Sequence, residues 1–180
     1  MARAARKRAE SGVYFVLLRS VNRSLFCGEK EEAAFLDALS LEKTRDFCEI
    51  YAYFLSGNKA YLVVKEGLSG ISTNIPRVCS SYASYVNKAR NQKGKLFYGR
   101  FLSEPLETPG EILEATRAIH RLPLKSGLSL NCNQSSYKHY FKSSDLVSSE
   151  EIIFLIGSRV DYRVYCDEEA EDDEERRMKN

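Results

Sequence analysis

The fold is decided by residues 48–65, which read CEIYAYFL, SGN and KAYLVVK in succession. Two runs rich in β-branched and aromatic residues flank a short turn sequence, and this arrangement predicts an antiparallel β-hairpin. Residues 13–19, VYFVLLR, have a similar composition and predict another, mostly buried strand. The sequence therefore predicts an antiparallel sheet of at least three strands.

Three helices are predicted around these strands. Residues 29–41 have acidic residues at the N-terminal end and apolar residues at helical spacing. In residues 71–89 apolar positions recur every three or four residues, and we expect Gly94 to close this helix. Residues 108–111, TPGE, form a capping box, so a third helix should run to about Arg121 before Pro123 stops it.

Residues 96–102 are short and aromatic, and they could form either a further strand or a loop over the sheet. The order of the elements predicts an α+β fold, a ferredoxin-like antiparallel sheet with helices packed on one face. We expect three segments: a domain over residues 1–142, a short helical appendage over 143–166 with apolar pieces near 152–156 and 160–165, and an acidic, disordered tail over 167–180.

Composition excludes several classes of protein. With 180 residues, 43% of them hydrophobic, the chain can form one globular domain. It has no apolar run long enough to cross a membrane, and its N-terminus lacks the apolar core of a signal peptide, so we expect a cytoplasmic protein without a membrane partner. The five cysteines contain no CxxC pair and the two histidines are far apart, which favours reduced thiols over a metal centre.

Charge is distributed unevenly along the chain. Eight acidic residues lie between Asp167 and Glu175, and the preceding 166 residues are basic, with 24 Lys and Arg against 17 Asp and Glu. The tail could be a solubilising extension, or it could compete as a polyanion for the basic surface. Residues 67–103 contain no acidic residue at all, but they contain six cations: Arg77, Lys88, Arg90, Lys93, Lys95 and Arg100.

Five aromatic residues are interspersed among these cations. They are Tyr82, Tyr85, Phe97, Tyr98 and Phe101. Mixed cationic and aromatic surfaces suit contact with phosphates and unstacked bases, so the segment predicts a nucleic-acid-binding surface. The alternative is a solvated helix face whose aromatic residues point into the core.

Five segments, residues 11–23, 51–58, 96–105, 119–127 and 135–137, follow one another in an order and spacing that resembles the HUH-type single-tyrosine transposases, especially the REP-associated tyrosine transposases. The resemblance covers about residues 3–142. It implies a ferredoxin-like fold, in agreement with the predicted element order, and a metal-dependent cleavage and transfer of DNA strands.

The resemblance also implies catalytic positions, and this chain has other residues there. The family has a His-hydrophobic-His pair that holds Mg or Mn, a nucleophilic tyrosine on a helix, and a polar residue one turn later. The matching residues here are Lys59 and Tyr61, Ala118, and Leu122. Lys59 would place a fixed positive charge near the position of the cation, and without a nucleophile no covalent intermediate can form. The resemblance thus implies a folded protein with no catalytic residues and no metal or other cofactor.

We therefore expect a catalytically silent DNA-binding protein that recognises hairpin or single-stranded repeat DNA. The expected contacts are the basic N-terminal arm, Arg77, Lys88, Arg90, Lys93, Lys95, Arg100 and Lys125. The oligomeric state is open, with a homodimer as one option.

Two alternatives remain. The first is an active strand transferase that uses Tyr82 or Tyr85 as a displaced nucleophile, and the second is a protein-interaction module whose acidic tail docks on a partner. His120 lies close in sequence to Ala118, but on a helix the two side chains point about 200° apart, which favours a structural role for the histidine. Tyr61 is a poor magnesium ligand and is expected to pack on the sheet.

Overall fold

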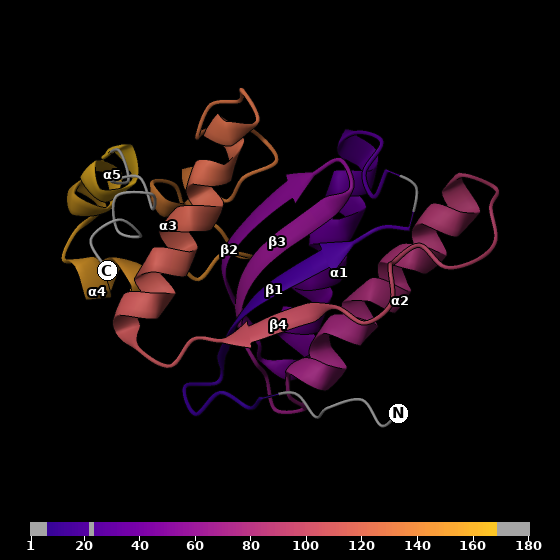
Figure 1. The fold of residues 1–180 in the computed structure, drawn as a ribbon, viewed down its shortest axis with the longest axis horizontal. Coiled ribbons are helices and arrows are strands. Elements are labelled where there is room, and N and C mark those ends of the chain that lie inside the picture. Colours follow the sequence, from indigo (N-terminus) through magenta and orange to yellow (C-terminus); the bar gives the residue numbers. More distant parts are fainter. Residues whose placement is uncertain (1–6, 22–23, 169–180) are drawn as a thin grey trace, which may run out of the picture.

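The computed structural model describes residues 7–21 and 24–168. Four antiparallel strands form one sheet in the order β2-β3-β1-β4. They are β1 (Val13–Arg19), β2 (Glu49–Ser56), β3 (Lys59–Lys65) and β4 (Leu102–Pro105) (Figure 1). The predicted hairpin is the β2–β3 pair, and the predicted α+β fold is confirmed. The greater part of the N-terminal arm and the acidic tail from residue 169 onward lie outside the described residues.

Helices α1 (Glu29–Asp46) and α2 (Ile71–Ala89) lie side by side behind the sheet (Figure 1). One face of the sheet is closely covered: Val16, Leu18 and Leu62 are at most 1% exposed. On the opposite face, the cross-strand neighbours Leu17 and Tyr61 are only partly buried. Strand alternation therefore gives the sheet one closed face and one face that is open at its β1 side.

The helix ends differ from the predicted ones. Helix α1 continues to Asp46, because the inward carboxylates of Glu42 and Asp46 accept hydrogen bonds from the Asn74 side chain of α2. Helix α2 ends at Ala89 and not near Gly94; Asn91, with φ 49°, turns the chain out of the helix.

Helix α3 (Pro109–Lys125) contacts β2 and β3 and begins with the predicted capping box, in which Thr108 and Glu111 bond to each other's backbone N–H groups. The helix does not stop before Pro123. A proline in the last turn removes one hydrogen bond, and the carbonyl of Pro123 accepts from the N–H groups of Ser126 and Leu128, which closes the end.

The C-terminal helices pack on α3. They are α4 (Glu150–Ile156) and α5 (Arg159–Asp167), close to the two predicted apolar pieces. A short 3-10 helix, η1 (Tyr137–Tyr140), precedes them and was not predicted. Tyr162 and Cys166 of α5 are fully buried, so these helices share the main core. Within the described part of the chain, no helix is long and apolar enough to span a bilayer.

Candidate nucleic-acid interface

The connection from α2 to β4 contains a bulge that opens the sheet edge. Pairing between β1 and β4 ends at Leu17 and Leu102, and a single bridge joins Ser20 to Phe97 further along. Residues 18–19 of β1 therefore oppose residues 98–101, and Gly99 takes a φ of 57°, which favours glycine. Residues 96–102 are thus mostly a loop, with only Leu102 in β4. The two extra residues leave Leu18, which pairs with Ala60 of β3, without a partner on the β4 side.

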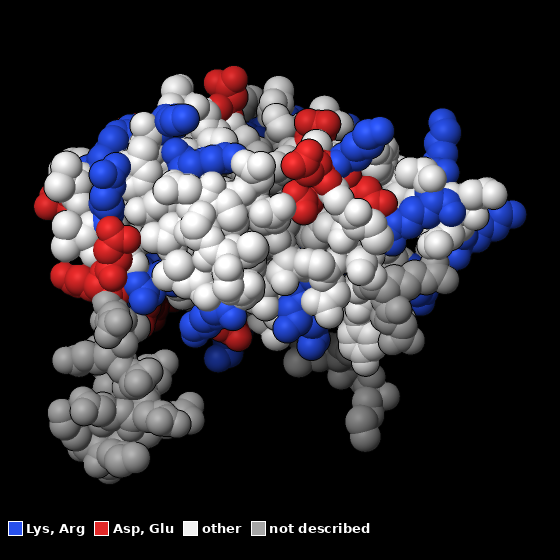
Figure 2. Space-filling model, turned by 90° about the horizontal axis from the view of Figure 1, so that it is seen from above, with Lys and Arg blue, Asp and Glu red and all other residues white. Residues whose placement is uncertain are grey.

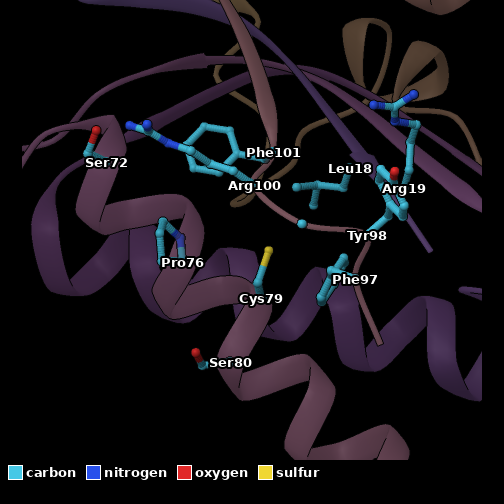
Figure 3. A pocket seen from close by; sticks show the side chains of 11 residues that line it. Leu18, Arg19, Ser72, Pro76, Cys79, Ser80, Phe97, Tyr98, Arg100 and Phe101 are labelled. Atoms are coloured by element: carbon cyan, nitrogen blue, oxygen red, sulfur yellow. The ribbon is translucent and has the colours of Figure 1, made fainter. Parts of the chain in front are cut away.

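A cavity of about 310 Å³ lies beneath this bulge, between β1, α2 and residues 97–101 (Figure 3). Arg100 and Phe101 lie on one side, Tyr98 and Arg19 on the other, and the Cys79 thiol points toward the cavity from α2. The guanidinium of Arg19 lies 5.7 Å from the centre of the Tyr98 ring, and Tyr98 is 62% exposed. Exposed rings beside cations are suited to stacking with bases and pairing with phosphates.

Four of the predicted cations lie at the C-terminal end of α2 and on the connection from α2 to β4, where Arg100 lies at the cavity beside Ser72 and Pro76 of the first turns of α2. Lys88, Lys93, Lys95 and Arg100 are exposed and form no ion pair with any described residue. Together with Tyr98 we call them the α2–β4 surface. Figure 2 shows Lys and Arg side chains projecting from the end of the molecule that carries the C-terminal half of α2. Lys88, Lys93 and Lys95 therefore face solvent at the C-terminal end of α2, and Arg100 faces solvent further along the same connection, at the cavity.

The other two cations of this segment, Arg77 and Arg90, form ion pairs with carboxylates of α1. Arg90 is 14% exposed at its side chain, forms an ion pair with Glu31 at 2.5 Å and donates to the carbonyls of Ser24 and Leu25. The hydrogen bond from Arg90 holds the pKa of Glu31 below its usual value. These contacts clamp α2 to α1. Arg90 as a DNA contact stays a prediction.

Arg77, nearer the N-terminal end of α2, also pairs with carboxylates of α1. Its guanidinium lies 3.3 Å from Glu42 and 3.9 Å from Asp46 of α1. Hydrogen bonds from Ser69 and Asn74 lower the pKa of Asp46, so this carboxylate stays charged opposite the arginine. The segment without acidic residues thus meets carboxylates from another helix, a fact that its own sequence does not reveal.

Lys125 lies apart from the α2–β4 surface. It is exposed at the C-terminal end of α3, which contacts β2 and β3 and lies away from α2 (Figure 1). Arg19, by contrast, was missed as a candidate although it lines the cavity. The sequence did contain a signal for Arg19: it is a cation at the end of a predicted strand, on the same face as Phe15 and Leu17.

The four positions that the resemblance marks as catalytic do not offer a metal site. Tyr61 stacks on Phe54, with ring centres 6.3 Å apart, in the packing role predicted for it. Leu122 packs against the core, and Ala118 lies one turn before it on α3. An ammonium and a phenol are unsuited to binding Mg or Mn, and no group of three His, Cys, Asp or Glu side chains able to hold a metal ion occurs among the described residues. The donor set at Lys59, Tyr61, Ala118 and Leu122 does not fit the cation.

His120 is a structural residue, as predicted. It is fully buried, its Nδ1 lies 2.7 Å from the Tyr162 hydroxyl, and its Nε2 lies 2.7 Å from the Ser136 hydroxyl. Burial lowers the pKa of His120 to about 3, with a smaller effect from His139. The imidazole is therefore neutral at physiological pH and both of its nitrogens are occupied.

The two tyrosines considered as displaced nucleophiles differ in access. Tyr82 is fully buried, its hydroxyl donates to the Leu25 carbonyl at 2.6 Å, and burial raises its pKa. A phosphate cannot reach this oxygen in the folded protein. Tyr85 is 42% exposed and remains accessible.

No protein-family model and no curated protein matches this sequence. Among solved structures, a REP-associated tyrosine transposase bound to a REP hairpin superposes with a TM-score of 0.66 at 15% identity, over 79% of this chain and 87% of that one. The chain has the fold of a REP-associated tyrosine transposase. A putative transposase from Deinococcus radiodurans gives a TM-score of 0.46 at 12% identity, over 71% of this chain and 99% of that one. The expected transposase-like fold is thus confirmed.

Proposed function

We propose that this protein binds DNA, in hairpin or single-stranded form, through the α2–β4 surface. The observation that carries the proposal is that four exposed cations, with no carboxylate partner among the described residues, lie along the end of α2 and the α2–β4 connection, which also carries an exposed tyrosine and borders an aromatic-lined cavity. Flexible exposed cations neutralise phosphates, and unpaired bases stack on aromatic rings. The transposase with the same fold is bound to a REP hairpin, which supports the same class of ligand here.

The proposal includes the absence of strand cleavage. Ala118 has no nucleophilic atom, and Lys59 and Tyr61 offer no ligand set for a divalent cation. Tyr82 is buried, so of the two displaced tyrosines only Tyr85 could act. A nucleophile without a polarised phosphate opposite it loses several kcal/mol of assistance.

A binding titration tests the first half of the proposal. Labelled hairpin, single-stranded and duplex DNA of matched length are titrated with the full chain at two salt concentrations. We expect the hairpin and single strand to bind more tightly than the duplex, with an affinity that falls by about 0.7 log units per log unit of salt for each neutralised phosphate. Equal, salt-independent affinities would contradict DNA binding and favour a protein-interaction module.

A denaturing gel tests the second half. The protein is incubated with labelled hairpin and Mg or Mn, and we expect neither cleavage products nor an adduct that survives SDS. An adduct that persists in Tyr82→Phe and disappears in Tyr85→Phe would establish the displaced-tyrosine enzyme.

A further inference from the structure

Two cations face each other at the end of the sheet. Arg19 is the last residue of β1, and its register partner on β3 is Lys59, the first residue of that strand. Directly opposed residues of antiparallel strands have their Cα atoms roughly 4.5–5.5 Å apart and project from the same face. Like charges in this arrangement are destabilising unless something neutralises them.

Nothing in the described part of the chain neutralises this pair. Neither residue forms an ion pair, and the contact found for Arg19 is the Tyr98 ring. The other register partner of Lys59 is Ser56, which is uncharged. Several other cations of the fold each have a carboxylate partner: Lys43, Lys65, Arg77, Arg90 and Arg159. The Arg19–Lys59 pair has no such partner among the described residues, and its two cations also lie directly opposite each other in the sheet.

Flat aromatic side chains border the pair on the same side of the molecule. Tyr61 follows Lys59 on the same face of β3 and is backed by Phe54. Tyr98 projects beside Arg19 with most of its surface exposed, and the cavity under the bulge begins at Arg19. The pair is therefore continuous with the α2–β4 surface through Arg19, Tyr98 and Arg100.

We propose that the Arg19–Lys59 pair binds one phosphodiester of the DNA directly, with no divalent cation between protein and phosphate. The proposal rests on the DNA binding proposed above and names a contact within it. Guanidinium and ammonium groups each donate hydrogen bonds to phosphate oxygens. One phosphate placed between them would neutralise the repulsion that the fold leaves in place, and the neighbouring rings of Tyr61 and Tyr98 would contact the adjoining nucleotides.

The experiment uses a labelled DNA hairpin that carries a single-stranded extension. Its phosphodiesters are replaced one at a time by neutral methylphosphonates. Binding is measured in EDTA for the wild type, Arg19→Ala, Lys59→Ala and the control Lys142→Ala, which removes an exposed charge beyond α3. We expect one linkage whose neutralisation weakens wild-type binding about tenfold but weakens binding by Lys59→Ala no further, since coupled groups are not additive. Lys142→Ala should retain the wild-type pattern.

Several outcomes would overturn the inference. They are wild-type affinity in Arg19→Ala and Lys59→Ala, additive losses at every linkage, or a loss of wild-type binding on adding EDTA. If one of these outcomes occurs while the wild type still binds the hairpin and variants of Lys93 and Lys95 bind it more weakly, the inference fails and the proposed function stands. If no DNA binds the wild type, the proposed function itself fails.

Stability provides an independent check on folding. Lys59→Met keeps the aliphatic stem and removes one of the two like charges, so the melting temperature without DNA should stay the same or rise at low salt. A clear fall would show that Lys59 has a structural partner within the protein, and would contradict the inference.

Discussion

The two edges of the sheet differ in the environment of their polar side chains, which are buried at the β2 edge and exposed at the β1–β4 edge. At the β2 edge, His120, Ser136 and Tyr162 are all buried, and the His120 imidazole is hydrogen bonded to the hydroxyls of the other two. The Tyr140 hydroxyl donates to the Tyr51 carbonyl. At the β1–β4 edge, Arg19, Tyr98 and Arg100 are exposed, and neither arginine has a carboxylate partner among the described residues.

The difference separates stability from binding. Buried polar groups that bond only within the fold contribute to its stability and cannot be reached by a ligand. Exposed cations without partners contribute little to stability and remain available for an anion. We therefore expect substitutions at the β2 edge to change unfolding, and substitutions at the β1–β4 edge to change DNA affinity.

The largest effect is expected for Tyr162→Ala at the β2 edge. This substitution removes a ring stacked on Tyr140, with centres 4.4 Å apart, and leaves His120 Nδ1 without its partner. It should lower the free energy of unfolding by about 3–5 kcal/mol, measured by urea denaturation. The control is Tyr165→Ala, at a half-buried position on the same helix, which should cost less. A larger loss in the control would place the stabilising contacts elsewhere.

Stability should also fall as the pH is lowered from 7.5 to 5. The pKa of His120 lies at about 3 in the folded protein, well below its value of roughly 6.5 in the unfolded chain. The unfolded state therefore binds more protons in this window, and its relative stabilisation should reach about 2 kcal/mol at pH 5. Half-burial lowers the pKa of His139 as well, which adds to the same trend.

The free energy of unfolding is measured between pH 7.5 and 5 for the wild type, His120→Gln and His139→Gln. Loss of the His120 imidazole should flatten most of the pH dependence between 7.5 and 5, whereas loss of the His139 imidazole should remove a smaller part. An unchanged slope in His120→Gln would show that other groups cause the effect.

At the other edge of the sheet, Lys93→Glu combined with Lys95→Glu should lower hairpin affinity at least tenfold at low salt, or about 1.4 kcal/mol, because both cations become anions on the α2–β4 surface. Fluorescence anisotropy measures the affinity. The matched control is Lys142→Glu with Arg163→Glu, which makes the same change in charge at exposed positions near Phe141. Equal losses in both variants would mean that net charge alone governs binding.

The smallest effect is expected from shortening the chain. Removal of residues 169–180 takes away most of the acidic run and should raise DNA affinity by roughly threefold at low salt, with no difference at high salt, where such charges are screened. The chain should end at Glu168 and not at Cys166, because the Glu168 carbonyl accepts from Arg117 and Arg121. An unchanged affinity at low salt would rule out competition by the tail.

Local patterns in the sequence determined the elements of this fold. Runs of β-branched and aromatic residues predicted β1, β2 and β3, the apolar stripe from Ile71 to Val86 predicted α2, and the Thr108 capping box predicted the start of α3. Each depends on neighbours within a few residues, so each can be recognised without knowledge of the fold. The errors lie at the helix ends, where contacts from other elements override the local preference. Residues 96–102, for which the sequence left a strand and a loop open, are mostly a loop.

Tertiary structure alone decided which charged residues are available to a ligand. Arg90 and Lys88 are nearly adjacent in sequence, yet Arg90 meets Glu31 from another helix and Lys88 meets no carboxylate among the described residues. In the same way, Arg19 and Lys59 become opposed cations only through the β1–β3 register. The physical reason is that ion pairing depends on distance in space, and these partners are tens of residues apart in the chain. The sequence by itself thus determined that the protein is basic and which secondary structure it forms, while the fold determined where the unbalanced positive charge lies.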